Sequence, residues 1–287
     1  MSFKAFWPGV VTLTFVAGTF LVPASAMAVD PTPTTPPPAT TPSTPRPTPK
    51  PTPRPTPKPT PLNACQVAAI AKKTTASRPF YRAATKPGMR DGGPFAINHV
   101  REAQYRLRWA KVYSGSVNGR YGSATKAAVK RFQAGNCLRA TGVLDTPTWA
   151  VLIQRTVRNR AAIPKICKSA GWHSCYDRAS HQDFLFVNGK MFNVWLVRGG
   201  MYSSQTRTGN YAVQARYREK VSTLYHVKMY YFMPHSGGEG QHGSGFMVDP
   251  WTGHSHGCIN MYIKDAKVLY TLSAGKRLNV TVYGHWS

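Results

Sequence analysis

A histidine and a cysteine near the C-terminus have the types and spacing of a base and a nucleophile. His242 precedes Cys258 by sixteen residues, and the cysteine lies in the sequence Ser-His-Gly-Cys-Ile-Asn at 255–260. A thiol attacks a carbonyl group well only when a base removes its proton, and a histidine imidazole is a common base. The glycine before the cysteine leaves room for an acyl substrate. These residues predict nucleophilic catalysis by Cys258, with His242 as general base.

The segment resembles the signature of the L,D-transpeptidase (YkuD-like) family, which has a histidine, a spacer of this length and then Ser/Thr-His-Gly-Cys-x-Arg/Asn. The resemblance implies that Cys258 is the nucleophile and His242 the general base. It also makes the backbone N–H groups of Gly257 and Cys258 candidate oxyanion donors, with Ser255 completing the motif. His256 is expected to shape the pocket and tune the thiol rather than take its proton.

Three further residues are candidate substrate contacts. Asn260 stands where the family more commonly has arginine, which affects a substrate contact but neither the nucleophile nor the base. Tyr230 and Tyr231 lie on a predicted strand that leads into the site. Either hydroxyl is a candidate for the pocket wall, and a core role is favoured for one of the two.

The resemblance also implies the reaction. The donor would be a peptidoglycan stem tetrapeptide, cleaved before its terminal D-alanine, and its acyl group would pass from the cysteine to an amine of a second stem. The product would be a cross-link that maintains the wall and the cell shape. With water as the acceptor, the enzyme would be a carboxypeptidase, and the sequence does not choose between the two acceptors.

A zinc peptidase is the alternative enzyme. His242, Gly245 and Asp249 reproduce the His-x-x-Gly-x-x-x-Asp spacing of zinc D-alanyl-D-alanine carboxypeptidases, and His285 would complete the ligands. However, the catalytic glutamate expected before the last histidine is missing, because no acidic residue follows Asp265. A non-catalytic wall-binding protein with an inert cysteine is the third possibility. We expect no metal and no cofactor.

The N-terminus predicts export. Residues 1–28 have Lys4 near the start, an apolar run and small residues suited to cleavage, as in a secretory signal peptide. A membrane anchor is the weaker alternative because the apolar run is short for a bilayer. No other stretch is long and apolar enough to cross one. We therefore expect a mature protein in the cell wall, outside the cytoplasm, without a stable membrane span.

The cysteine count agrees with this compartment. Of the five cysteines, an even number should pair under oxidising conditions, which leaves one over. The close spacing of Cys167 and Cys175 predicts a local disulfide. Cys65 and Cys137 would then form a second, although four cysteines allow three pairings. Cys258 remains free in this interpretation.

Charge and composition indicate the surroundings of the protein. The formal net charge is +27, from 37 basic and 10 acidic residues, which favours polyanionic partners. An exported chain rarely meets nucleic acid, so anionic wall polymers are expected partners besides peptidoglycan, with solubility as the plain alternative. Residues 29–62 are almost wholly Pro and Thr with basic repeats. Because proline removes backbone donors, this segment predicts a disordered linker of polyproline II type.

Residues 63–160 predict a small helical module. Apolar residues recur at helical spacing from Val100, Ser123 is a possible N-cap of a second helix, and Thr146-Pro147 begins a third. Together with the turn at Asn118-Gly119, this series resembles the peptidoglycan-binding type-one module. The resemblance implies a three-helix core that binds peptidoglycan, with a role as spacer or prodomain as the alternative.

Residues 161–287 predict a mostly β domain. The runs 183–187 and 190–197 flank Asn188-Gly189, the dipeptide of a two-residue hairpin. Further strands are expected over 210–216, 223–232 and 278–283, with a helix after the cysteine motif. The family resemblance likewise implies a β-rich sandwich. The expected fold class is therefore multidomain α + β, with a helical binding module, a sandwich-like catalytic domain and a disordered linker.

Overall fold

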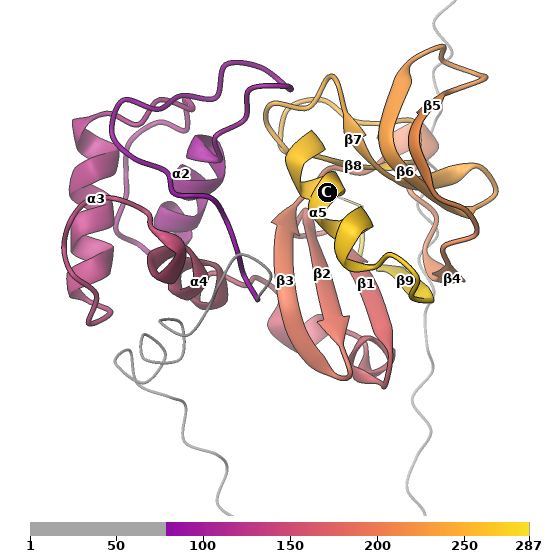
Figure 1. Ribbon diagram of the computed structural model, residues 1–287, viewed down its shortest axis with the longest axis horizontal. Coiled ribbons are helices and arrows are strands. Elements are labelled where there is room, and N and C mark those ends of the chain that lie inside the picture. The colour runs from indigo at the N-terminus through magenta and orange to yellow at the C-terminus, as the bar shows by residue number, and fades with distance from the viewer. Residues whose placement is uncertain (1–78, 287) are drawn as a thin grey trace, which may run out of the picture. The chain divides into compact units, whose positions relative to one another are not determined.

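The computed structural model describes residues 79–286 (Figure 1). The predicted signal peptide at 1–28, the linker at 29–62 and Cys65 lie outside the described residues. All of the described residues belong to one compact unit of the chain. Helices come first and strands follow, which confirms the predicted α + β class. Within 79–286, no helix combines the length and the apolar character that crossing a bilayer requires.

Three helices share the core of the N-terminal module: α2 (Val100–Trp109), α3 (Ser123–Ala134) and α4 (Thr146–Arg155). Each buries one apolar face, as the spacing predicted. The cap of α3 differs from the prediction, since Gly122 is the N-cap and Ser123 is already helical. The side chain of Asp145 caps α4 by accepting from the Thr148 N–H at 2.9 Å.

The predicted turn at Asn118-Gly119 depends on a buried glutamine. Gln104 accepts from the N–H groups of Asn118 and Gly119 at 3.1 and 2.9 Å. Its amide nitrogen donates to the carbonyl of Arg120 at 3.1 Å. Gly119 has φ +72°, a conformation that favours glycine. One side chain thus replaces the solvent for three backbone groups of the turn.

The C-terminal domain consists of two sheets and a helix, α5 (Ile263–Leu272). The strand order is β3-β2-β1-β9-β4 in the first sheet and β5-β6-β7-β8 in the second. The strands are β1 (Trp172–Asp177), β2 (Gln182–Val187), β3 (Lys190–Leu196), β4 (Gly209–Ala212), β5 (Tyr217–Val221), β6 (Lys228–Ser236), β7 (Glu239–Ser244), β8 (Ile259–Met261) and β9 (Leu278–Tyr283).

Strand periodicity gives the first sheet two buried faces. In β2, Phe184 and Phe186 belong to the core that also contains the helices, whereas Leu185 belongs to the core with β8 and α5. In β3, Val194 and Trp195 divide in the same way. Because successive side chains point to opposite faces, the sheet packs against the module on one side and against the second sheet on the other.

The predicted strands agree with the structure in part. The hairpin at Asn188-Gly189 and the strand at 278–283 are present. Only the first part of the predicted strand 210–216 is a strand, because β4 ends at Ala212. The strand predicted at 223–232 begins later, at Lys228 of β6. The sequence did not predict β1, β5, β7 or β8. β7 reads Glu-Gly-Gln-His-Gly-Ser, so it has no apolar alternation although most of it is buried.

The predicted disulfide between Cys167 and Cys175 is present. Cys137 is also disulfide-bonded, and its predicted partner lies outside the described residues. Cys258 is free. The local disulfide attaches the short 3₁₀ segment Lys165–Lys168 to β1, directly after the module.

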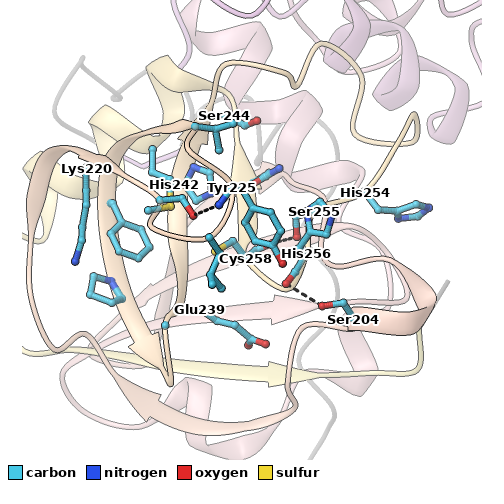
Figure 2. A pocket seen from close by; sticks show the side chains of 18 of the residues that line it. Ser204, Lys220, Tyr225, Glu239, His242, Ser244, His254, Ser255, His256 and Cys258 are labelled. Carbon is cyan, nitrogen blue, oxygen red and sulfur yellow. Dashed lines mark hydrogen bonds between the residues drawn. The ribbon is translucent and has the colours of Figure 1, made fainter.

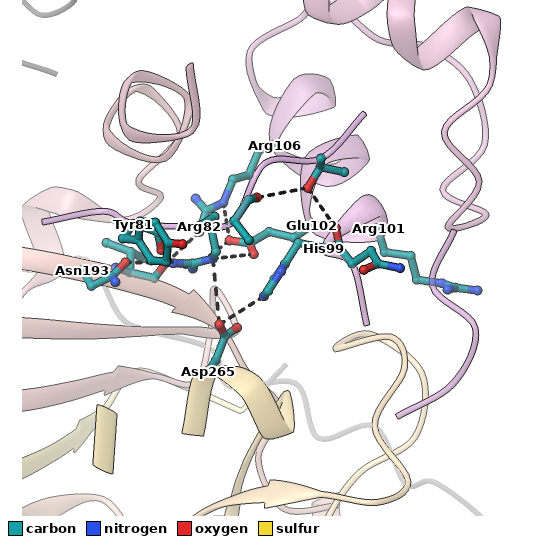
Figure 3. Close-up of polar contacts among 12 residues, drawn as sticks. Tyr81, Arg82, His99, Arg101, Glu102, Arg106, Asn193 and Asp265 are labelled. Atoms are coloured by element: carbon teal, nitrogen blue, oxygen red, sulfur yellow. Dashed lines mark hydrogen bonds and ion pairs between the residues drawn. The ribbon is translucent and has the colours of Figure 1, made fainter. Parts of the chain in front are cut away.

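A buried charge cluster joins the module to the sheet and to α5 (Figure 3). Glu102 accepts from Arg82 at 3.0 Å and from Arg106 at 2.8 Å, and all three side chains are almost completely buried. Both arginines also donate to the carbonyl of Val194 on β3 at 2.9 Å. Burial alone would raise the pKa of Glu102, but the two arginines outweigh this effect and hold the pKa below its usual range.

Replacing Glu102 tests the role of this cluster. Glu102→Gln leaves the buried Arg106 without a carboxylate and leaves Arg82 only the 4.0 Å contact with Asp265. Breaking comparable buried pairs costs about 3–5 kcal/mol. We expect a correspondingly lower free energy of unfolding in urea. Glu219→Gln, which removes an exposed carboxylate paired with Lys228, is the control and should leave the midpoint within error. Equal stability of the Glu102 variant and the native chain would show that the cluster does not hold the module in place.

A second buried polar network lies between the sheets, next to His242. Ser174 on β1 donates to Asp183 on β2 at 2.8 Å, and Gln241 on β7 donates to both side chains at 2.7 and 3.0 Å. Burial raises the pKa of Asp183 to about 7, against the opposing effect of these hydrogen bonds. The network links the first sheet to the strand that carries the predicted base.

The raised pKa of Asp183 predicts a dependence of stability on pH. The unfolded chain releases the proton near its usual pKa of 3.8 and the folded chain only near 7, so stability falls as pH rises between these values. The shift corresponds to roughly 4 kcal/mol. Between pH 4 and 8, we expect the native protein to lose roughly 4 kcal/mol of unfolding free energy relative to the Asp183→Asn variant. A difference independent of pH would contradict the assignment.

Candidate active site

The parallel pairing of β7 and β8 brings His242 and Cys258 to one face of the second sheet. His242 pairs with Asn260, and Gln241 pairs with Ile259. Cys258 lies two residues before Asn260, so its side chain points to the same face as that of His242. Gly243 allows the close approach of α5, because a Cβ there would lie 2.8 Å from the Cα of Ile263. Strand register therefore positions both predicted groups.

Both side chains line a cavity of about 820 Å³ (Figure 2). Leu224, Tyr225 and Phe246 form an exposed apolar rim, and Met229 and Phe232 of β6 line the interior. Charged residues are also present in the wall: Arg198, Arg207, Lys220, Lys228 and Glu239. Of the predicted site residues, the structure brings Cys258, His242, Ser255, His256 and Asn260 into this wall.

The ring of His242 has one nitrogen engaged. Nδ1 lies 3.0 Å from the carbonyl oxygen of Gly243, which accepts a hydrogen bond from the ring. This contact favours the tautomer with a free Nε2 lone pair, as a general base requires. Burial lowers the pKa of His242 to about 4, and the nearby Arg198 adds to this effect. The ring is therefore neutral at physiological pH.

The thiol of Cys258 is also neutral at rest. Burial raises its pKa to about 11, and Glu239 adds to this effect, while a backbone hydrogen bond from Gly240 opposes both. No hydrogen bond joins the sulfur to the His242 ring among the described side chains. The site thus holds a neutral thiol and a neutral imidazole. Attack by the sulfur therefore requires transfer of the thiol proton to a base during the reaction.

The turn before Cys258 is held by Ser255. Its hydroxyl accepts from the Gly257 N–H at 3.1 Å and donates to the carbonyl oxygen of Cys258. Gly257 has φ +123°, and a Cβ there would lie 2.8 Å from Glu239 Oε1. Because Ser255 occupies the Gly257 N–H, the prediction of two oxyanion donors is corrected. Of the two predicted groups, the Cys258 N–H remains the candidate.

His256 lies in the wall rather than at the base position. Its ring is exposed and stacks on Tyr225, with ring centroids 4.1 Å apart. Its carbonyl oxygen accepts from Ser204 at 2.9 Å. This placement fits the expected shaping role. Neither contact involves the sulfur of Cys258.

The two predicted tyrosines lie outside the pocket wall. Tyr230 packs edge-on against Phe95, and Tyr231 packs against Tyr270 in the core. The pairing of β6 with β7 is irregular between Tyr230 and Met233, and Tyr231 has φ +55°. This irregularity breaks the alternation of side chains, so Met229 and Phe232 face the pocket instead. The core role expected for one of the two is confirmed for Tyr231, and the predicted place of either hydroxyl in the pocket wall is corrected.

Sequence reasoning did not identify Arg198. Backbone hydrogen bonds of 3.0 and 2.8 Å join it to Asn260, and its side chain lines the pocket while being only 6% exposed. One guanidinium nitrogen donates to the carbonyl of Thr252 at 2.7 Å, whereas Nε has no partner. The carboxamide oxygen of Asn260 is likewise without a partner. No local sequence pattern distinguishes this arginine, since it follows β3 without a motif.

The loop between β7 and β8 is attached to the module. Tyr105 of α2 donates to Asp249 at 2.9 Å and stacks on Trp251, with ring centroids 4.3 Å apart. Trp109 of α2 contacts Trp251 as well. Asp249 also accepts from the Trp251 N–H at 2.9 Å, as a turn-forming residue does. The helical module thus supports the loop that separates His242 from Cys258.

The zinc-site alternative does not fit these contacts. The carboxylate of Asp249 is turned to Tyr105, and no described set of three ligand groups contains His242, Asp249 or His285. Among the described residues, His99, Glu102 and Asp265 are the set that converges. The Glu102 carboxylate is already paired with two arginines. The His99 Nε2 lies 3.1 Å from Asp265 Oδ1. This set is therefore part of the charge cluster described above.

Family models match both regions. A putative peptidoglycan-binding domain matches residues 98–152, and the L,D-transpeptidase catalytic domain matches residues 172–281. The chain carries an L,D-transpeptidase catalytic domain. The enzyme thus combines a peptidoglycan-binding module with this domain, which confirms the predicted families and the predicted type of enzyme. Both domains indicate that peptidoglycan is its partner and that it acts in the wall, outside the cytoplasm.

Solved structures include similar chains. The L,D-transpeptidase of Stackebrandtia nassauensis is 24% identical, with 73% of this chain and 98% of that chain covered and a TM-score of 0.44. That of Xylanimonas cellulosilytica is 22% identical, with 71% and 98% covered and a TM-score of 0.41. An L,D-transpeptidase from Mycobacterium smegmatis is 19% identical, with 40% of this chain and 59% of that chain covered and a TM-score of 0.37. Among curated proteins, the comparison gave no match.

The neutral thiol can be tested by alkylation. With a pKa of about 11, Cys258 is ionised to about one part in ten thousand at pH 7. We expect its rate of reaction with iodoacetamide to rise about tenfold per pH unit from pH 7 to 10, because only the thiolate reacts. A peptide with an ordinary cysteine, which levels off near pH 9, is the control. A rate that is already constant below pH 7 would reveal a thiolate–imidazolium pair instead.

Proposed function

We propose that the enzyme cross-links peptidoglycan stem peptides through a covalent acyl-enzyme on Cys258, with His242 as the general base. The observation that carries this proposal is the placement of a free cysteine and a correctly oriented histidine on one face of β7 and β8, inside a large open cavity. Ser255 and His256 shape the turn and the wall, and Asn260 with Arg198 lines the floor beside them.

The first half of the reaction forms the thioester. His242 Nε2 takes the proton of the Cys258 thiol as the sulfur attacks the carbonyl carbon before the terminal D-alanine. The N–H of Cys258 stabilises the oxyanion, a contribution of about 3 kcal/mol in comparable sites. When the C–N bond breaks, the imidazolium returns the proton to the leaving amine. The base is then neutral again and ready for the second half.

The second half transfers the acyl group to a primary amine of another stem. The amine nitrogen attacks the thioester carbonyl, the C–S bond breaks, and His242 passes the amine proton to the departing sulfur. An amide and a free thiol result, which balances the reaction. Water in place of the amine would give the hydrolysed stem, so the ratio of the two products describes the activity.

The charges of the cavity suit such a substrate. Four cationic side chains line it, and stem peptides carry free carboxylates. Arg198 is the best placed, because its buried Nε has no protein partner and it lies close enough to affect His242. A donor carboxylate would satisfy that nitrogen.

The remaining features fit an exported wall enzyme. The signal peptide predicted at 1–28 would export the chain, and the disulfide between Cys167 and Cys175 is typical of an oxidising compartment. The linker at 29–62 and the net charge of +27 would favour contact with anionic wall polymers. The module, proposed at 63–160, would bind peptidoglycan, and the catalytic domain would span 161–287.

Two histidine variants distinguish the base from the wall. We expect His242→Ala to reduce turnover of a disaccharide tetrapeptide donor by 10²- to 10⁴-fold, as loss of a general base does. His256→Phe keeps a ring that can stack on Tyr225, and turnover should fall by less than about tenfold. Release of D-alanine, followed by chromatography, measures both. The reverse order of the two effects would assign the proton transfer to His256.

A further inference from the structure

The pocket wall contains a carboxylate that the acylation step does not use. Glu239 is the only acidic residue among the described residues that line the cavity. Its carboxylate lies against the backbone of Gly257, since a Cβ on that glycine would be 2.8 Å from Oε1. In Figure 2, Glu239 and His242 are drawn on opposite sides of Cys258. Glu239 is also close enough to raise the pKa of the thiol.

The carboxylate is partly satisfied by one arginine. Arg207 donates to Oε1 through its Nε at 3.0 Å and to Oε2 through its backbone N–H at 3.1 Å. A carboxylate has about four acceptor positions, so further positions remain for a ligand. The Glu239 side chain is 12% exposed and the Arg207 side chain is 55% exposed. Arg207 therefore lies closer to the solvent than Glu239, and the Glu239 carboxylate faces the cavity beside Cys258.

A negative charge at this position hinders the first half of the reaction. It disfavours the thiolate and the oxyanion, both of which are anions near Cys258. In the second half, the incoming reactant is a primary amine that is mostly an ammonium ion at neutral pH. A carboxylate attracts that ion and holds it by charge-assisted hydrogen bonds. The Glu239 carboxylate thus favours the reaction only in the second half, when the acceptor is cationic.

We propose that Glu239 binds the ammonium group of the acceptor stem and so directs the thioester toward transpeptidation rather than hydrolysis. The inference rests on the proposed function, because it requires the acyl-enzyme on Cys258. The bound ammonium releases one proton to solvent, the amine attacks the thioester carbon, and the C–S bond breaks. The amine's second proton passes through His242 to the sulfur, which restores the thiol.

The product ratio of Glu239→Gln tests the proposal. The donor is a disaccharide tetrapeptide, and the acceptor is a tetrapeptide with a free side-chain amine. The variant keeps the shape of the side chain but loses its charge. We expect the ratio of cross-linked to hydrolysed product, measured by mass spectrometry at several acceptor concentrations, to fall about tenfold. An unchanged ratio, or an equal loss of both products, would overturn the role in acceptor binding.

Two further variants separate charge from structure. Arg207→Gln removes the cation that competes for Glu239, so acceptor use should increase, whereas a purely structural pair would lose activity as Glu239→Gln does. Glu219→Gln removes an exposed carboxylate on β5 that does not line the cavity. It should behave as the native enzyme. A fall in its product ratio like that of Glu239→Gln would show a non-specific effect of charge and would overturn the proposal.

A separate measurement keeps the two proposals distinguishable. A carbapenem-type β-lactam acylates the thiol when the sulfur adds to the ring carbonyl and the C–N bond opens, so the intact mass increases by the whole reagent. An adduct on native enzyme and on Glu239→Gln, with equal product ratios, would refute only the role of Glu239. Absence of an adduct and of donor turnover in the native enzyme would refute the acyl-enzyme itself.

Discussion

The parallel register between β7 and β8 is the constraint on which the site depends. It places His242 opposite Asn260 and so sets its ring on the same face as Cys258. A shift by one residue would turn one of the two side chains to the opposite face of the sheet. Small residues permit this arrangement, since Gly243 lets α5 approach and Gly257 leaves space for Glu239. Backbone pairing, rather than a direct contact between the two side chains, therefore sets the arrangement on which the proposed chemistry depends.

The helical module forms part of the structure that supports this register. It shares a core with Phe184, Phe186 and Val194 of the first sheet, and Tyr105 contacts the loop between β7 and β8. The buried group of Glu102 and two arginines adds directional contacts to β3. The module and the catalytic domain are thus packed together, although the family models describe them as separate domains.

The sequence predicted which residues share the pocket better than it predicted the strands that hold them. His242, Cys258 and the free state of the cysteine followed from motif and parity, because chemistry restricts the residue types and spacing. β7 and β8 did not follow, since small and polar residues such as Gly240 and Gln241 are buried there through hydrogen bonds and close backbone packing. Arg198 and Glu239 reach the pocket through tertiary contacts that no local pattern records. Neither Tyr230 nor Tyr231 reaches the pocket, because an irregular pairing breaks strand alternation, and Tyr231 takes the core role expected for one of them.

The central claim is that the acyl group of the donor becomes attached to the sulfur of Cys258. It can be tested by mixing the enzyme with a disaccharide tetrapeptide donor, quenching in acid within the first turnovers and mapping the peptides by mass spectrometry. We predict that the peptide containing Cys258 increases in mass by the donor minus its terminal D-alanine, and that hydroxylamine removes the addition as it does for a thioester. Turnover with the acyl group on another residue, or with no covalent species under conditions that trap thioesters, would contradict the account.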